Sequence, residues 1–189
     1  MDIDLDLQKV SKNLIAGIEN TVGLAKQSIN KGMIIIEGDI HKTKDSKLVM
    51  IHDGDFKRIA GKDINVADLN YDDLPNFQEN ILIHFAENEY YSNKNNSVHK
   101  PDLFEDFLKE FQDKEVYFVI EVKTACENDL KAALKMIKKY NMEDKVCIGI
   151  TAKNLTSFKK ENEFFISYMG IKSLLVIYAA FLLGIRYNF

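Results

Sequence analysis

The stretch that decides the fold is Gly32–Asp53, which reads GMIIIEGDIHKTKDSKLVMIHD. Its first apolar run ends in the acids Glu37 and Asp39, and its second apolar run ends in His52 and Asp53. Short runs of branched apolar residues bounded by polar residues are typical of buried strands. Two strand-like segments that both end in ionisable groups indicate the edge of an active site rather than a plain core.

The bulk composition predicts one globular domain that does not bind nucleic acid. The chain has 189 residues, of which 46% are hydrophobic, and this is enough for a sizeable core. Its net charge is −4, and lysines and arginines are spread along the chain without forming a basic stripe. The two cysteines, Cys126 and Cys147, lack metal-ligand spacing. We expect buried free thiols in a reducing compartment.

The two ends of the chain differ in character. The first residues are acidic and lack the layout of a signal peptide. Near the other end, Phe164–Ile185 is almost wholly apolar, broken mainly by Lys172. This length can span a bilayer if Lys172 is tolerated, whereas the uninterrupted part, Ser173–Ile185, is too short. A membrane anchor and a buried strand or helix are equally compatible with it. We therefore expect a domain over 1–163 and a separate apolar segment over 164–189, in a protein that is cytoplasmic or membrane-associated with its domain facing the cytoplasm.

The expected secondary structure alternates between strands and helices. Strand patterns cover residues 13–16, 33–39, 47–52, 117–123 and 145–151. Helical patterns cover residues 21–30, 102–112, 127–140 and 155–163. The strands are apolar on both faces, as buried parallel strands are. A segment from about residue 40 to residue 100 interrupts this α/β order, and its Asn-rich part, Glu87–His99, is expected to form a loop. Pro101 and Asp102 then mark a plausible start of the next helix.

Four ionisable residues are expected to meet at the carboxyl ends of two strands. Because side chains alternate across a strand, Glu37 and Asp39 share one side, and so do Glu121 and Lys123. In a parallel α/β barrel such residues gather at one mouth. Carboxylates packed together repel unless a cation lies between them, and ligands that are all oxygen favour Mg²⁺ or Ca²⁺. Solvated charges at strand ends are the common alternative for any one acid, but an E-x-D beside an E-x-K favours a functional site.

His52 is a candidate general acid or base, because its ordinary pKa lies near neutrality and it stands at a strand end beside Asp53. Arg58 follows within a few residues. A phosphate contact is one interpretation of Arg58, and a surface salt bridge is the default. The remaining histidines have no comparable setting and are interpreted as surface or packing residues: His41, His84 and His99.

Six short motifs follow one another in an order that resembles the glycerophosphodiester phosphodiesterase family. They are Glu19-Asn20-Thr21, Glu37-Gly38-Asp39, Thr43-Lys44-Asp45, His52-Asp53, Pro101-Asp102-Leu103 and Glu121-Val122-Lys123. The resemblance covers roughly residues 13–155. It implies a TIM-barrel-like (β/α) fold, partial in this chain, with an insertion after the second strand. It also implies metal-dependent hydrolysis of a glycerophosphodiester or lysophospholipid substrate, with glycerol 3-phosphate and an alcohol as the glycerophosphodiester's products.

The resemblance also implies roles for individual residues. Glu37, Asp39 and Glu121 correspond to the ligands of the family's divalent cation, Mg²⁺ or Ca²⁺. His52 corresponds to a catalytic acid or base. Lys123 corresponds to a catalytic cation that faces the substrate phosphate, and Arg58 is a second candidate for substrate binding.

The chain departs from the family pattern in two places. The family's His-Arg-Gly is absent, because Leu14-Ile15-Ala16-Gly17 runs almost directly into Glu19. Losing one of two acid–base partners typically costs a factor of about 10² to 10⁴ in rate. A barrel also needs about 250 residues, and only four or five barrel strands are expected here. The alternative function is therefore a catalytically inactive relative that binds a phosphodiester, a lipid headgroup or a protein partner.

Overall fold

The computed structural model describes residues 17–83, 89–92, 100–123 and 126–149. The strand expected at 13–16, the helix expected at 155–163 and the apolar segment Phe164–Ile185 lie outside these residues. Within the described ranges, no helix has both the length and the apolar character that crossing a membrane requires.

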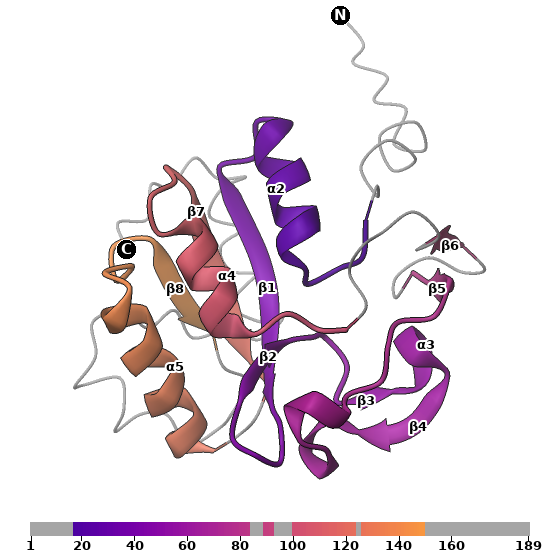
Figure 1. Cartoon of the computed structure of the whole chain (residues 1–189). Helices are drawn as coiled ribbons and strands as arrows, with labels where there is room; N and C mark the ends of the chain where they lie inside the picture. Colours follow the sequence, from indigo (N-terminus) through magenta and orange to yellow (C-terminus); the bar gives the residue numbers. More distant parts are fainter. Residues whose placement is uncertain (1–16, 84–88, 93–99, 124–125, 150–189) are drawn as a thin grey trace, which may run out of the picture.

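Three parallel strands form the centre of the molecule, with an antiparallel strand at one edge (Figure 1). The strand order is β2-β1-β7-β8, with bounds Leu48–Met50, Ile35–Lys42, Tyr117–Val122 and Val146–Gly149. β1 pairs in parallel with β7, and β7 pairs in parallel with β8. The parallel arrangement expected from the apolar strands is therefore confirmed for β1, β7 and β8.

The parallel expectation is wrong for β2, which folds back as an antiparallel partner of β1. The turn between them is short and closed by Thr43, whose Oγ1 accepts a hydrogen bond from Lys47 N at 3.0 Å and donates one to Asp45 at 2.6 Å. Ser46 completes the turn with a φ of 65°. Because β2 returns alongside β1, its end approaches Asp39, and Ile51 N donates to Asp39 O at 3.0 Å.

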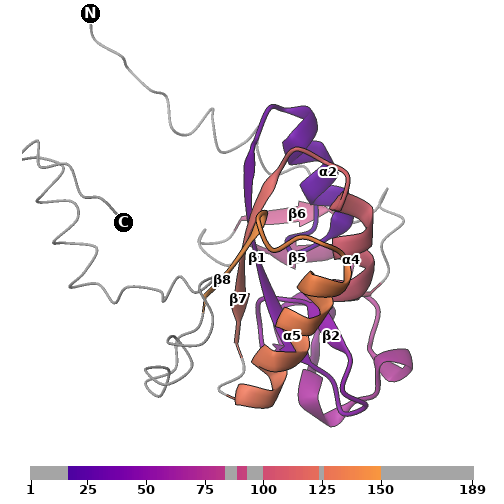
Figure 2. The ribbon, with the colours of Figure 1, turned by 90° about the vertical axis from the view of Figure 1, so that its left-hand side faces the viewer.

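Three helices pack on one face of the sheet (Figure 2). They are α2 (Val22–Asn30), α4 (Phe104–Phe111) and α5 (Glu127–Lys139). Their apolar residues interlock with alternate strand residues in the main core. The rings of Phe107, Phe111 and Phe118 lie at the centre of this core, with centroids 4.9 to 5.3 Å apart. Strand residues between the core positions consequently point to the opposite face.

The start of α2 links two distant parts of the chain. Thr21 is its N-cap, and Thr21 Oγ1 accepts a hydrogen bond from Leu24 N at 3.2 Å. Val22 N donates to the carboxylate of Asp102 at 2.7 Å. Asp102 was expected near the start of α4, but that helix begins at Phe104 and has Leu103 as its N-cap. The Asp102 carboxylate instead accepts a hydrogen bond from a backbone N–H in the first turn of α2, where the helix itself supplies no acceptor.

The segment between β2 and α4 forms a small subassembly with its own core. Its elements are β3 (Asp55–Phe56), α3 (Lys57–Ala60), β4 (Lys62–Asn65), η1 (Val66–Asp68), η2 (Tyr71–Asp73), β5 (Asn80–Leu82) and β6 (Tyr90–Ser92). A second cluster of buried apolar residues lies beneath them, including Phe56, Ile59 and Ile81, and it also takes in Ile18 and Val49. The loop expected over Glu87–His99 is corrected in part, because Tyr90–Ser92 pairs antiparallel with β5.

Both cysteines are free thiols, as expected, but their expected burial is corrected. Cys126 is exposed at the N-cap of α5, and Cys147 is only partly buried. Cys147 lies between the core residues Val146 and Ile148, and therefore on the face of the sheet away from the helices.

Candidate active site

Three carboxylates meet on the face of the sheet opposite the helices. Glu37 and Asp39 lie two residues apart on β1, and Asp39 is the register partner of Glu121 on β7. Each residue offers a carboxylate oxygen, and these oxygens all lie within 4.8 Å of one another. Asp39 and Glu121 are buried and Glu37 is exposed, so the group opens toward solvent on one side.

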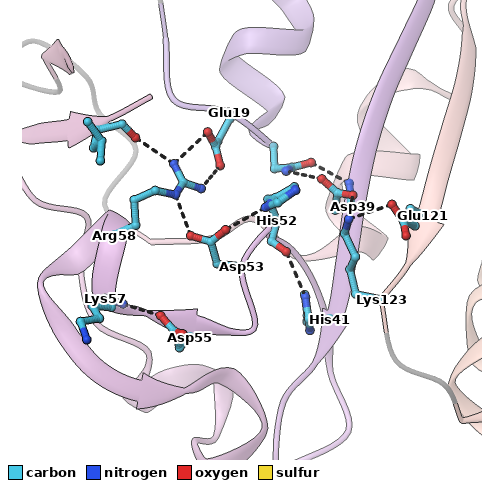
Figure 3. A network of polar contacts seen from close by, with 12 residues as sticks. Glu19, Asp39, His41, His52, Asp53, Asp55, Lys57, Arg58, Glu121 and Lys123 are labelled. Carbon is cyan, nitrogen blue, oxygen red and sulfur yellow. Dashed lines mark hydrogen bonds and ion pairs between the residues drawn. The ribbon is translucent and has the colours of Figure 1, made fainter. Parts of the chain in front are cut away.

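Lys123 supplies a positive charge to this carboxylate group. Its Nζ lies 3.0 Å from Asp39 Oδ1 and 2.7 Å from Glu121 Oε2 (Figure 3). Burial lowers the pKa of Lys123, but the carboxylates of Glu121 and Asp39 outweigh this effect and leave the pKa raised. The ammonium is therefore held in its charged form next to two of the three acids.

The carboxylate group has more negative charge than Lys123 alone offsets. Burial is the largest cause that raises the pKa of Glu37, and the neighbouring charge of Asp39 raises it further. Asp39 Oδ1 is buried and accepts no aligned hydrogen bond, although it forms the ion pair with Lys123. Buried carboxylate oxygens are normally satisfied by donors or by a metal. Three converging carboxylates, one of which has an oxygen without an aligned hydrogen bond, fit a hard divalent cation such as Mg²⁺ or Ca²⁺.

The side-chain amide of Asn20 fixes one of these acids. Asn20 Oδ1 accepts a hydrogen bond from Asp39 N at 2.7 Å, and Asn20 Nδ2 donates one to Asp39 Oδ2 at 3.0 Å. Asn20 has a φ of 54°, which asparagine tolerates better than most residues. The segment before α2 thus reaches across to β1 and holds both the backbone and the side chain of Asp39.

A chain of polar contacts fixes His52 beside the acids (Figure 3). His52 Nδ1 lies 2.7 Å from Asp53 Oδ1, and Arg58 Nε donates to Asp53 Oδ2 at 2.7 Å. Arg58 also donates to Glu19 in a paired contact and to Leu82 O at 3.0 Å. The side chain of Arg58 is only 12% exposed. This network fixes the ring of His52 through Nδ1.

The pKa values within this network follow from its burial and its charges. Burial raises the pKa of Asp53, but hydrogen bonds from Arg58 and His52 outweigh it, so the pKa is lowered overall. Burial lowers the pKa of Arg58, and its contacts with Glu19 and Asp53 reverse this to a raised value. Asp53 is therefore a carboxylate and Arg58 a cation at neutral pH.

His41, which was interpreted as a surface or packing residue, lies against the same site. Its Nε2 is 3.2 Å from the carbonyl oxygen of His52. Because a carbonyl only accepts hydrogen bonds, this contact places a proton on His41 Nε2. Burial is the largest cause that lowers the pKa of His41. His41 thus supports the backbone of His52 as a neutral ring at neutral pH.

A cavity of about 260 Å³ opens between α2 and β1 next to this site. Asn20 and Glu37 contribute polar lining, and apolar lining comes from residues that include Leu24, Met33 and Phe107. Ala25, Met50 and Phe107 in this lining belong to the main core on the helical side of the sheet, and Glu37 is the member of the carboxylate group that lines the cavity.

Most of the residues expected from the sequence do come together. Glu37, Asp39, Glu121 and Lys123 form one group, and His52 lies in the adjoining network; their proposed roles stay predictions. Arg58 points its guanidinium at protein groups, and its expected contact with a substrate phosphate also stays a prediction.

Sequence reasoning missed the parts that Asn20, Glu19 and Asp53 play in holding this site. The signal was present in two motifs, Glu19-Asn20-Thr21 and His52-Asp53. No sequence spacing, however, connects residue 20 to residue 39 or residue 19 to residue 58.

Comparisons with known proteins identify similar sequences. The model of the glycerophosphoryl diester phosphodiesterase family matches residues 10–179. The human lysophospholipase D GDPD1 is 27% identical over 126 residues, which are 67% of this chain and 38% of that protein. A glycerophosphodiester phosphodiesterase of Caldanaerobacter subterraneus is 29% identical over 134 residues, which are 69% of this chain and 51% of that protein.

Solved structures show the same fold. A glycerophosphoryl diester phosphodiesterase domain from Mycobacterium tuberculosis superimposes with a TM-score of 0.65 at 11% identity, covering 89% of this chain and 60% of that one. This likeness confirms the expected α/β fold, a partial TIM-barrel-like arrangement. The chain spans about half the length or less of the curated relatives described above.

Proposed function

Because the chain belongs to the glycerophosphoryl diester phosphodiesterase family, we propose that it hydrolyses glycerophosphodiesters to glycerol 3-phosphate and an alcohol. One observation carries the proposal: the carboxylates of Glu37, Asp39 and Glu121 converge next to a lysine and a fixed histidine. This combination offers both charge stabilisation and proton transfer at one place.

The three carboxylates would hold the divalent cation, Mg²⁺ or Ca²⁺. When bound, such an ion stabilises the negative charge that builds up on the phosphoryl oxygens. Lys123, which contacts Asp39 and Glu121, places a second positive charge at the same edge. We propose that it faces the substrate phosphate and limits the repulsion between the incoming anion and the acids.

His52 is the proposed proton-transfer residue. Asp53 holds its Nδ1 at 2.7 Å, and we propose that Nε2 is the nitrogen that carries the proton in the reaction. In the reaction the oxygen of water bonds to phosphorus and the bond from phosphorus to the alcohol oxygen breaks. The alcohol takes up a proton and water gives one up, and His52 Nε2 can serve either transfer. Arg58 contributes by holding Asp53, and its phosphate contact is a further proposal.

The test is turnover of defined diesters by the full chain. We expect choline release from glycerophosphocholine in the presence of Mg²⁺ or Ca²⁺. Lysophosphatidylcholine is the second substrate to test, because relatives of this chain carry the name lysophospholipase D. His52→Ala should reduce turnover by about 10² to 10⁴. Turnover that is unchanged in His52→Ala would refute the role of His52.

Metal binding is tested separately by thermal unfolding. Mg²⁺ or Ca²⁺ should raise the melting temperature of the wild-type chain, because a ligand that binds only the folded state stabilises it. Glu37→Gln should abolish this rise. Glu110→Gln is the matched control, because Glu110 forms an exposed ion pair with Lys26 on the helical side. An equal rise in all three proteins would contradict the assigned ligands.

The second candidate function is binding of a phosphodiester or lipid headgroup without turnover. It is favoured by the absence of the His-Arg-Gly motif before Glu19. In this case the metal-dependent shift persists and glycerophosphocholine stabilises the protein, while no choline is released at any metal concentration. Membrane association through Phe164–Ile185 is a separate proposal, tested by comparing the partition of the full chain and of residues 1–163 into phosphatidylcholine vesicles.

A further inference from the structure

We propose that Asn20 is a positioning residue that holds Asp39 ready for the divalent cation. This inference rests on the metal site of the proposed function. It goes beyond that site because both side-chain atoms of Asn20 bond to Asp39, Oδ1 to its backbone N–H and Nδ2 to its carboxylate.

The two hydrogen bonds between Asn20 and Asp39 determine how Asp39 is oriented. In one, Asp39 N donates to Asn20 Oδ1 at 2.7 Å, and in the other, Asn20 Nδ2 donates to Asp39 Oδ2 at 3.0 Å. With the backbone and one carboxylate oxygen held, rotation of the carboxylate is restricted. The remaining oxygen, Oδ1, is the one that lacks an aligned hydrogen bond and contacts Lys123. Asp39 is 2% exposed, so water has little access to replace the amide of Asn20.

Asn20 is itself held from both sides. Before it, Glu19 is paired with Arg58. After it, Thr21 caps α2 and donates from its hydroxyl to Ile18 O at 2.7 Å. These anchors fix a left-handed backbone conformation at Asn20, with a φ of 54°. The amide is therefore presented to Asp39 by a rigid segment, which is what a residue in the second coordination sphere needs in order to orient a ligand.

Gly38 provides the space that this contact requires. A Cβ added to Gly38 would lie 3.1 Å from Asn20 Oδ1 and 2.9 Å from Met50 Cε. The backbone of β1 is thus closely covered by Asn20 at the residue before Asp39. Glycine at this position therefore leaves room for both Asn20 Oδ1 and Met50 Cε.

The test is metal affinity, measured by calorimetric titration of the full-length wild-type chain and of Asn20→Gly with MgCl₂ and with CaCl₂. Glycine keeps the left-handed backbone and removes the amide. Loss of such a supporting contact typically weakens metal binding about 10-fold to 100-fold, and we expect this loss for Asn20→Gly. Gly38→Ala should weaken binding in the same direction.

Asn141→Gly is the matched control. Asn141 also has a left-handed conformation, with a φ of 52°, and it follows α5 on the helical side of the sheet. The affinity of Asn141→Gly for Mg²⁺ and Ca²⁺ should stay within about twofold of the wild-type affinity. If Asn20→Gly also stays within about twofold while the wild-type chain binds metal, the inference is overturned and the metal site stands. If the wild-type chain binds neither metal, the proposed metal site and this inference both fail.

A second measurement does not depend on the folding of a variant. In the NMR spectrum of the wild-type chain, the side-chain amide protons of Asn20 should exchange slowly and shift when metal is added. Those of Asn141 should not shift. An Asn20 amide that exchanges fast and ignores the metal would overturn the inference.

Discussion

Asp53 contacts two partners at once, His52 through Oδ1 and Arg58 through Oδ2. A neutral amide at this position can keep the contact with Arg58 only by turning its oxygen toward the guanidinium. Its NH₂ group then faces His52 Nδ1 and selects the tautomer in which Nδ1 lacks a proton. The proton-transfer properties of His52 therefore depend on the charge of a neighbouring residue.

The first prediction is that Asp53→Asn lowers turnover of glycerophosphocholine by about 10² to 10⁴, because it removes the carboxylate that orients His52 for acid–base work. The circular dichroism spectrum should be unchanged. Asp55→Asn is the control, because Asp55 lies on β3 and accepts from Lys57 N outside the His52 network. Equal activity of both variants would show that Asp53 does not act on His52.

The second prediction concerns acid stability. The folded-state pKa of Asp53 is lowered, so its contribution to stability is fully present above the ordinary carboxyl pKa of about 4. The contribution is lost as the pH falls through the lower folded value. The difference in unfolding free energy between wild type and Asp53→Asn should therefore shrink from pH 6 to pH 3. Urea unfolding at several pH values measures it, and a difference that does not vary with pH would contradict the lowered pKa.

The β1–β2 hairpin places His52 near the carboxylates. Its turn is fixed by Thr43, which is 2% exposed and bonds to both Lys47 and Asp45. Asp45 in turn accepts a hydrogen bond from Tyr71 N at 3.0 Å. The turn is thereby tied to the subassembly that follows it.

The third prediction is that Thr43→Val destabilises the protein by about 0.5–1.5 kcal/mol, because it removes the hydrogen bonds of the buried Thr43 hydroxyl with Lys47 N and Asp45 Oδ1. Lys44→Ala, at the exposed neighbouring position, should change stability by less than about 0.5 kcal/mol. Chemical denaturation of both variants measures these effects. Equal stability of Thr43→Val and wild type would show that the hydroxyl is dispensable to the turn.

The elements were largely predictable because their signals are local. The apolar run before Glu37 predicts β1, and the spacing of Leu130, Ala133 and Leu134 predicts α5. The direction of β2 and the strand Tyr90–Ser92 were not predictable, because pairing depends on contacts that no local pattern encodes. The acid group followed from strand alternation, whereas the contact of Asn20 with Asp39 depends on how a loop crosses to β1.

Arg58 joins two bodies, the subassembly and the central sheet with its helices. It belongs to α3 of the subassembly, and it contacts Glu19 in the segment that leads into α2. The two apolar cores meet in the same region, because Ile18 and Val49 pack into the core of the subassembly. Few other charged contacts bridge the two bodies at comparable burial among the residues that the structure describes.

The fourth prediction is that Arg58→Ala destabilises the protein by about 3–5 kcal/mol, because it leaves Glu19 and Asp53 partly buried without their cation. Lys57→Ala should cost no more than about 1 kcal/mol, because its ion pair with Asp63 is exposed. In Arg58→Ala, amide hydrogen exchange should be faster in the subassembly than in the central sheet. Similar stability of the two variants would show that Arg58 is not the link between the two bodies.

The reversal of the chain at Thr43–Lys47 places a constraint on how this gene can change. Side chains on β2 alternate with a period of two, so the loss or gain of one residue in the turn would shift the pairing with β1 and exchange the faces of Met50, which packs in the main core, and Val49, which packs in the core of the subassembly. Insertions elsewhere between β2 and α4 would leave that pairing intact. The length of this five-residue turn should therefore vary less among related sequences than the residues that form it.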